Sequence, residues 1–261
     1  MKGKTVKKNA GIICISILAA LFLILSACDG LGGGGQDGEL IVGTGGFTTI
    51  QNAIDTSADG DTIIVLPGTY SENLEIDGKN IVLRSATRQE LEDLEFNFPG
   101  DPADYDIIAN TIIEGGGSGD VVTLKGESDS EILRFTIQKG VSGISVLQSS
   151  RAVITGNIIK DNTDGGIYLY TKNTAETPSR ATITENTITN NTSSVGGGIM
   201  LSYLANATIE NNTISTNTAT DLYHGGGGIG LYYLSASSVT ITGNEISGNT
   251  AYENGSGIFV D

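Results

Sequence analysis

The chain has 261 residues, with 30 acidic and 14 basic side chains, 37 glycines and no tryptophan. No acidic residue and only four lysines precede Cys28, so the part from Cys28 onward has a formal charge of 10 − 30 = −20. This negative charge argues against nucleic acid as a partner. It also repels acidic polysaccharides, unless a divalent cation bridges the two.

The first 27 residues predict a signal for export. Four lysines precede an apolar run over residues 11–25, and Ser26, Ala27 and Cys28 follow. The run is shorter than the roughly 20 residues that a membrane-spanning helix needs.

The ending Leu25-Ser26-Ala27-Cys28 resembles the lipobox of bacterial lipoproteins, which implies cleavage after Ala27 and a lipid on Cys28. We therefore expect a lipoprotein signal peptide over residues 1–27, and the lipidated cysteine with a glycine-rich tether over residues 28–39. The expected partner of Cys28 is a membrane. The expected location is the bacterial cell envelope, either in the periplasm or at the cell surface. An ordinary secretory signal with a stray thiol is the alternative.

Repetition is the main feature of the rest of the chain. A segment close to Thr-Ile-Thr-Gly-Asn-x-Ile-x-x-Asn-Thr recurs four times, and a looser copy spans residues 131–140. Each copy is followed by a Gly-Ile-x-Leu motif, whose two aliphatic residues alternate as in a strand with one buried face. The repeats contain two sets of equivalent asparagines, which are Asn157, Asn186, Asn212 and Asn244, and Asn162, Asn191, Asn217 and Asn249.

One such unit cannot bury its apolar edge alone, whereas units stacked about 4.8 Å apart cover one another. The second set of asparagines is then expected at one turn on successive coils, because asparagine tolerates left-handed backbone geometry and its amide can bind the next amide. Ahead of the repeats, apolar residues at helical spacing over 50–55, with Thr49 as the N-cap, predict a short helix that covers the first coil.

The segments 49–54, 60–63 and 67–70, together with Glu72, resemble the opening of pectin-lyase-like right-handed β-helix proteins. The resemblance implies an all-β fold, a right-handed parallel β-helix with a short N-terminal capping helix, over residues 40–261. Because the chain stops directly after a core-facing Val260, we expect this domain to be incomplete at its C-terminus. The fold hosts lyases, hydrolases, adhesins and proteins of no known activity, so it leaves the function open.

Catalysis on acidic polysaccharides would need a basic group for proton abstraction, or a pair of carboxylates at catalytic separation. Asn162-Thr163-Asp164 is similar to one piece of the polygalacturonase signature, but the other pieces are absent. The loops before the Gly-Ile strands hold acidic residues and the single histidine of the chain. The candidate catalytic residues are Asp164, Asp221, His224, Glu253, Lys160 and Lys172, and ordinary surface roles are the simpler interpretation of each.

Four aromatic residues alternate with core aliphatics and are therefore expected on one outer face, where they would suit stacking against sugar rings. They are Tyr168, Tyr170, Tyr232 and Phe259. Cross-strand packing that protects the sheet is the alternative.

The acidic segment 90–106 contains no basic residue and could hold calcium through Asp101, Asp104 and Asp106. It lacks the spacing of a known calcium loop, so a solvated surface loop is the preferred interpretation and no cofactor is evident. Three functions remain: an envelope lipoprotein that binds polysaccharide or partner molecules, a polysaccharide lyase or glycoside hydrolase, and a purely structural envelope protein. The missing catalytic signature favours the first.

Overall fold

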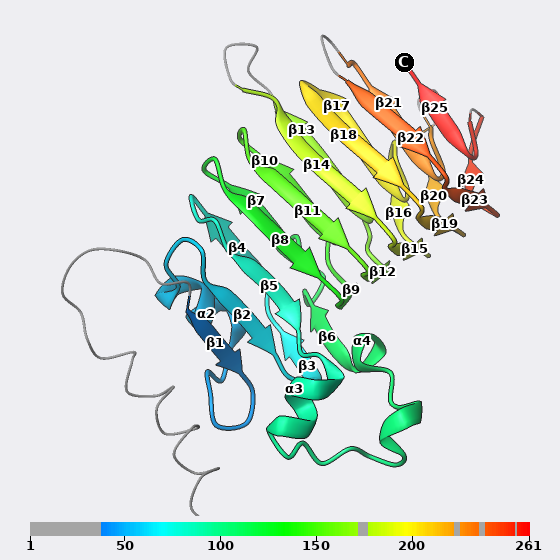
Figure 1. Ribbon diagram of the computed structural model, residues 1–261. Helices are drawn as coiled ribbons and strands as arrows, with labels where there is room; N and C mark the ends of the chain where they lie inside the picture. The colour runs from blue at the N-terminus through cyan, green and yellow to red at the C-terminus, as the bar shows by residue number, and fades with distance from the viewer. Residues whose placement is uncertain (1–37, 172–176, 222–224, 235–237, 254) are drawn as a thin grey trace, which may run out of the picture. The chain divides into compact units, whose positions relative to one another are not determined.

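Strands of two to six residues follow one another around a coil, and each pairs in parallel with the equivalent strand one coil later. The computed structural model describes residues 38–171, 177–221, 225–234, 238–253 and 255–261. In this part of the chain the strands stack into a right-handed parallel β-helix (Figure 1), which confirms the predicted fold. No helix of these residues is long and apolar enough to cross a membrane.

Three long sheets form the walls of the β-helix and a short one adds an edge. Sheet A contains β1 (Glu39–Val42), β2 (Thr62–Val65), β5 (Val82–Ser85), β8 (Asp129–Leu133), β11 (Arg151–Thr155), β14 (Ser179–Thr184), β18 (Ala205–Glu210) and β22 (Val239–Thr242). Sheet B contains β3 (Gly68–Ser71), β6 (Thr111–Glu114), β9 (Thr136–Gln138), β12 (Ile158–Lys160), β15 (Thr187–Thr189), β19 (Thr213–Ser215) and β23 (Glu245–Ser247). Sheet C contains β4 (Leu74–Asp77), β7 (Val122–Lys125), β10 (Ile144–Leu147), β13 (Ile167–Thr171), β17 (Ile199–Tyr203), β21 (Ile229–Tyr232) and β25 (Ile258–Val260). Sheet D contains β16 (Thr192–Ser193), β20 (Thr218–Ala219) and β24 (Thr250–Ala251).

The core is made of aliphatic side chains that repeat in register from coil to coil. Ile154, Ile183 and Ile209 are fully buried partners on sheet A. Ile144, Ile167, Ile199 and Ile229 are fully buried partners on sheet C. Burying one isoleucine contributes about 1.5–3 kcal/mol relative to leaving it exposed. The apolar edge of each inner repeat is thus covered by its neighbours, whereas in the last strand Ile258 and Val260 are 41% and 67% exposed.

Two ladders of buried asparagines fill the turns that flank sheet B. In the first ladder the amide Nδ2 of Asn186 donates to the Ile154 carbonyl at 2.8 Å and to Asn212 Oδ1 at 3.0 Å. The backbone N–H of Asn186 also donates to Asn212 Oδ1, at 2.9 Å. Asn162, Asn191, Asn217 and Asn249 form the second ladder in the same way. Each amide therefore replaces the hydrogen bonds that its tight turn would otherwise lose.

The asparagines themselves do not carry the left-handed backbone, contrary to the sequence-based expectation. The residue before each ladder position does, as at Glu185 with φ 57° and Asp161 with φ 56°. The ladder asparagine is instead selected for its side chain, whose carbonyl and amide together satisfy the adjacent coils.

The predicted capping helix is confirmed as α2 (Ile50–Thr56), with the Thr49 side chain accepting from the Asn52 N–H. Ile50, Ala53 and Ile54 join the main core and close its first coil. The Glu72 carboxylate accepts from the N–H groups of the first two helical residues. Lys79 donates to three carbonyls at the other end. Both charges match the helix dipole.

An insertion between sheets A and B carries three short helices that the sequence period does not reveal. They are α3 (Arg88–Asp93), the 3-10 helix η2 (Pro102–Asp104) and α4 (Ile107–Asn110). Phe96, Phe98 and Ile107 pack with Leu91 in a small separate core. Arg84 on β5 pairs with Glu90 at 2.5 Å, so the insertion does have a compensating base, supplied from outside the acidic segment.

Candidate functional site

Five tyrosine rings form a continuous line on the outer face of sheet C, which we call the tyrosine stripe. Neighbouring ring centroids are 5.7 Å apart for Tyr168 and Tyr170, 5.5 Å for Tyr170 and Tyr203, 6.0 Å for Tyr203 and Tyr233, and 3.9 Å for Tyr233 and Tyr232. The first three are separations of interacting aromatic pairs, and the rings of the adjacent residues Tyr232 and Tyr233 are closer still. The stripe crosses β13, β17 and β21, so consecutive coils supply it.

The tyrosines of the stripe differ in exposure, and the most exposed are Tyr203 and Tyr233 rather than the two at its ends. Tyr233 and Tyr203 are 52% and 39% exposed, whereas Tyr168 is half-buried and its hydroxyl lies 3.5 Å from Ser202 Oγ. Burial raises the pKa of Tyr168, and the hydrogen bond with Tyr233 raises the pKa of Tyr232 to about 12. Both hydroxyls therefore stay neutral at physiological pH.

Tyr203 and Tyr233 were not among the aromatic residues predicted to face outward. Strict alternation from Leu201 and Leu231 assigns both to the core. The structure turns them outward because each sits at the end of its strand with a left-handed backbone, φ 58° at Tyr203 and 49° at Tyr233. The equivalent segments Leu-Ser-Tyr-Leu at 201–204 and Leu-Tyr-Tyr-Leu at 231–234 carry the signal, since they place a tyrosine at the same turn of successive coils.

Of the four predicted outward aromatics, Tyr168, Tyr170 and Tyr232 lie in the stripe, and Phe259 lies at the register position of Tyr168, three strands further along sheet C. Phe259 is in register with Gly230, and Gly230 with Met200. Glycines of the preceding loops pack against this row of side chains. A Cβ on Gly196 would lie 2.7 Å from Met200 Cβ, and one on Gly255 would lie 2.9 Å from Phe259 Cβ. Met200 and Gly230 therefore stand between Tyr168 and Phe259 in this row.

The acidic candidates lie on the loops beside the stripe. The exposed Asp164 accepts a hydrogen bond from Ser193 Oγ at 3.2 Å, and the backbone N–H of Asp221 donates to the Ser194 carbonyl. After the larger effects of burial and of the tyrosine pair, the charges of Asp164 and Asp221 also raise the pKa values of Tyr168 and Tyr232 respectively. Both carboxylates therefore act electrostatically on hydroxyls of the stripe, as the charge of Asp261 does on Tyr232. Glu253 is exposed after β24, and His224 lies outside the described residues.

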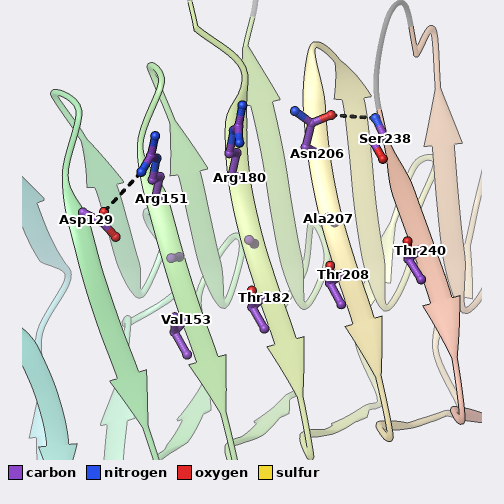
Figure 2. Close-up of a pocket in the computed structure, with 12 residues that line it drawn as sticks. Asp129, Arg151, Val153, Arg180, Thr182, Asn206, Ala207, Thr208, Ser238 and Thr240 are labelled. Atoms are coloured by element: carbon purple, nitrogen blue, oxygen red, sulfur yellow. Dashed lines mark hydrogen bonds and ion pairs between the residues drawn. The ribbon is translucent and has the colours of Figure 1, made fainter.

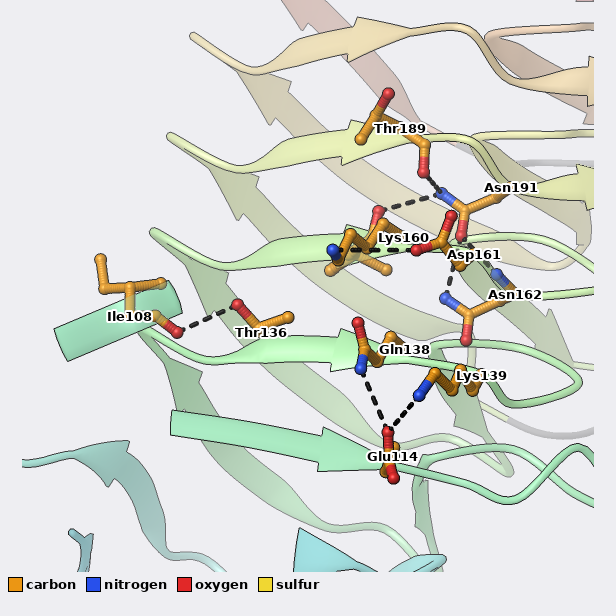
Figure 3. A network of polar contacts seen from close by, with 11 residues as sticks. Ile108, Glu114, Thr136, Gln138, Lys139, Lys160, Asp161, Asn162, Thr189 and Asn191 are labelled. Carbon is orange, nitrogen blue, oxygen red and sulfur yellow. Dashed lines mark hydrogen bonds and ion pairs between the residues drawn. The ribbon is translucent and has the colours of Figure 1, made fainter. Parts of the chain in front are cut away.

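The basic candidates are not brought to this site. Lys160 lies on β12 in sheet B and its Nζ is 3.8 Å from Asp161 of the adjoining turn (Figure 3). This pair is exposed, and Asn162 beside it belongs to the buried ladder. Lys172 and the predicted lipidation site Cys28 lie outside the described residues.

Two of the three acidic candidates for calcium cap short helices. Asp101 caps η2 through the Ala103 N–H, and Asp106 caps α4 through the Ala109 N–H. Asp104 is exposed within η2. Within the described residues no group of three or more His, Cys, Asp or Glu side chains is arranged to hold a metal ion.

The family model "Right handed beta helix region" matches the chain twice, over residues 40–191 and 120–261. No curated protein and no solved structure matches it. The two overlapping matches cover every coil described above and include the strands that carry the tyrosine stripe. The chain therefore belongs to the right-handed β-helix family, with the pectin-lyase-like fold.

Proposed function

We propose that the tyrosine stripe binds neutral polysaccharide chains. The observation that carries this proposal is the unbroken contact of five tyrosine rings along one sheet face, with two of the rings substantially exposed. Aromatic faces suit the apolar faces of sugar rings, and phenol hydroxyls suit their hydroxyl groups.

Charge favours a neutral ligand at this place. The negative charges of Asp164, Asp221 and Asp261 act on hydroxyls of the stripe. The charges of these carboxylates would repel an acidic chain laid along the stripe, whereas their oxygens can accept hydrogen bonds from sugar hydroxyls. The stripe also crosses several coils, so it suits an extended chain of linked sugars.

The test is affinity electrophoresis of the full chain in mild detergent, through gels that contain a neutral glucan, xylan or mannan. We expect retardation in at least one of these gels, and a loss of about tenfold or more in affinity when Tyr203 and Tyr233 are both changed to Ala. Tyr252→Ala is the matched control, because Tyr252 is 68% exposed and lies outside the stripe. Equal retardation of all three proteins would contradict the proposal.

The same samples, assayed for released sugars, distinguish polysaccharide binding from the two alternatives, a carbohydrate-active enzyme and a purely structural protein. A carbohydrate-active enzyme would release reducing sugars or unsaturated products, and Asp164 and Asp221 would then be the first residues to replace. The absence of both retardation and products would leave a purely structural role.

The proposal includes a place in the cell. A lipid on Cys28 would hold the β-helix on a membrane of the bacterial envelope, in the periplasm or at the surface, where polysaccharides are available. The support is the lipobox-like sequence 25–28 and the glycine-rich segment behind it. Incorporation of a labelled fatty acid into the wild type and not into Cys28→Ser tests this part, and equal labelling of both would contradict it.

A further inference from the structure

A row of polar side chains crosses the outer face of sheet A, on a different wall from the tyrosine stripe. Asp129, Arg151, Arg180 and Asn206 are direct partners on four neighbouring strands, β8, β11, β14 and β18. Figure 2 shows them side by side at the rim of a hollow of about 550 Å³. Adjacent strands are about 4.8 Å apart, so the two arginines stand next to each other.

The row carries more positive charge than its neighbours neutralise. Arg151 and Asp129 are 3.7 Å apart and both more than half exposed, which makes their ion pair weak. Arg180 is exposed, and no ion pair of its guanidinium is found among the described residues. Like charges on directly opposed residues destabilise a sheet. An anion between the two guanidiniums would remove this cost and accept hydrogen bonds from both.

The next side chain of the row adds a donor. Asn206 Oδ1 accepts from the Ser238 N–H at 2.6 Å, which orients the amide. Its Nδ2 then points away from Ser238 toward β14, the strand of Arg180 (Figure 2). Three donor groups on consecutive strands thus line one side of the hollow.

Threonine hydroxyls line the rest of it, together with Val153 and three alanines. Three threonines are in-register partners on β14, β18 and β22: Thr182, Thr208 and Thr240. Thr182 and Thr208 come two residues after Arg180 and Asn206, which is the next outward-facing position of each strand. Figure 2 shows their side chains on the same face as the arginines. A threonine hydroxyl can donate and accept, as sugar hydroxyls do. A small inorganic anion would contact the two arginines and leave the three threonine hydroxyls without a ligand.

We infer that this row and its threonine rank form a second binding site, for a glycan whose sugars carry carboxylate or sulfate groups. Arg151 and Arg180 take the anionic group, Asn206 and the threonines take neighbouring hydroxyls, and the chain runs across the strands. The rest of the protein is strongly acidic and repels a polyanion. Binding is therefore local, favours short or sparsely charged chains, and weakens as salt screens the arginines. This site does not depend on the tyrosine stripe.

The test compares polygalacturonate oligosaccharides, sulfated dextran oligosaccharides and uncharged dextran oligosaccharides in calorimetric titrations of the full chain in detergent at low salt. We expect binding of the carboxylated or the sulfated ligand, or both, and a rise in Kd of at least about tenfold in the double variant Arg151→Gln, Arg180→Gln. The arm that binds identifies the anionic group.

The matched control is the double variant Lys139→Gln, Lys160→Gln. It removes the same two charges from exposed positions near sheet B, where the lysines pair with Glu114 and Asp161. We expect this control to keep its Kd within about twofold, since only its net charge is altered. Thermal unfolding of each variant verifies that it is folded, as the exposed positions lead us to expect.

Binding of neither charged ligand, equal losses in the two double variants, or equal binding of uncharged dextran would overturn the inference. The variant Tyr203→Ala, Tyr233→Ala is expected to keep the salt-sensitive binding. A failure of the tyrosine stripe and a failure of the arginine row are therefore distinguishable.

Discussion

At the scale of single residues, the buried asparagines matter most for stability. Asn186 is 1% exposed and joins three coils, because it binds Ile154 of the preceding one and Asn212 of the following one. Asn157 in turn donates to Asn186 Oδ1, from both its backbone N–H and its amide. Loss of one amide leaves buried donors and acceptors on both sides without partners.

We predict that Asn186→Ala lowers the free energy of unfolding by about 2–4 kcal/mol, since each unsatisfied buried group costs roughly 1–3 kcal/mol. Urea denaturation followed by circular dichroism measures the change. Asn52→Ala, at an exposed position of α2, is the control and should fall within about 0.5 kcal/mol of the wild type. A similar small effect at Asn186 would show that the ladder contributes little.

The same residues show what the sequence could foretell. The asparagine period predicts the ladder, because equivalent positions must coincide once the coils stack. It does not predict the left-handed backbone, which falls on unlike residues such as Asp161, Glu185 and Gly156. Tyr203 and Tyr233 were missed for a related reason: a turn with positive φ reverses the side of the chain that alternation assigns.

At the scale of elements, the insertion is attached to sheet A by charge. Arg84 of β5 and Glu90 of α3 form two hydrogen bonds, and Glu90 also completes the capping box with Thr87. The hydrogen bond from Arg84 is the main cause that lowers the pKa of Glu90 from about 4.5 to about 2. The carboxylate is partly exposed, so we expect solvent screening to limit its contribution to about 1 kcal/mol.

A lowered pKa means that this contribution is present above pH 4.5 and is lost as the pH falls toward 2. We predict that Glu90→Gln is less stable than the wild type at pH 7, and that the difference in free energy of unfolding shrinks between pH 5 and pH 2. Denaturant titrations across that range measure it. Glu92→Gln on the same helix is the control, and a difference that does not vary with pH would contradict the assignment.

Helices of the domain were predictable only where the apolar spacing is helical. α2 shows that spacing over residues 50–54, and its N-cap Thr49 was identified. The short α3, η2 and α4 were not predicted, because side-chain caps and a local aromatic cluster stabilise them. In the sequence Asp101 and Asp106 belong to an acidic run, whereas in the structure each accepts a hydrogen bond as the N-cap of a short helix.

At the scale of the whole molecule, repetition determines both the fold and the two proposed sites. Stacked coils bring equivalent positions into rows, so the tyrosine stripe on sheet C and the arginine row on sheet A each combine residues from successive coils, about 22–33 apart in the sequence. The sequence indicated the first row in part, through Tyr168, Tyr170 and Tyr232. It did not indicate the arginine row, because the sequence alone does not show that Arg151 and Arg180 are direct partners beside a hollow on sheet A.

The central functional claim is that the tyrosine stripe contacts sugar, and tyrosine fluorescence tests it most directly. The chain has nine tyrosines and no tryptophan, so its intrinsic emission reports tyrosines alone, and five of them form the stripe. Titration with cello-, xylo- and manno-oligosaccharides should give a saturable change with at least one ligand. The change should persist in Tyr252→Ala and disappear in Tyr203→Ala, Tyr233→Ala. An unchanged signal in the wild type, or an equal change in the stripe variant, would contradict the claim.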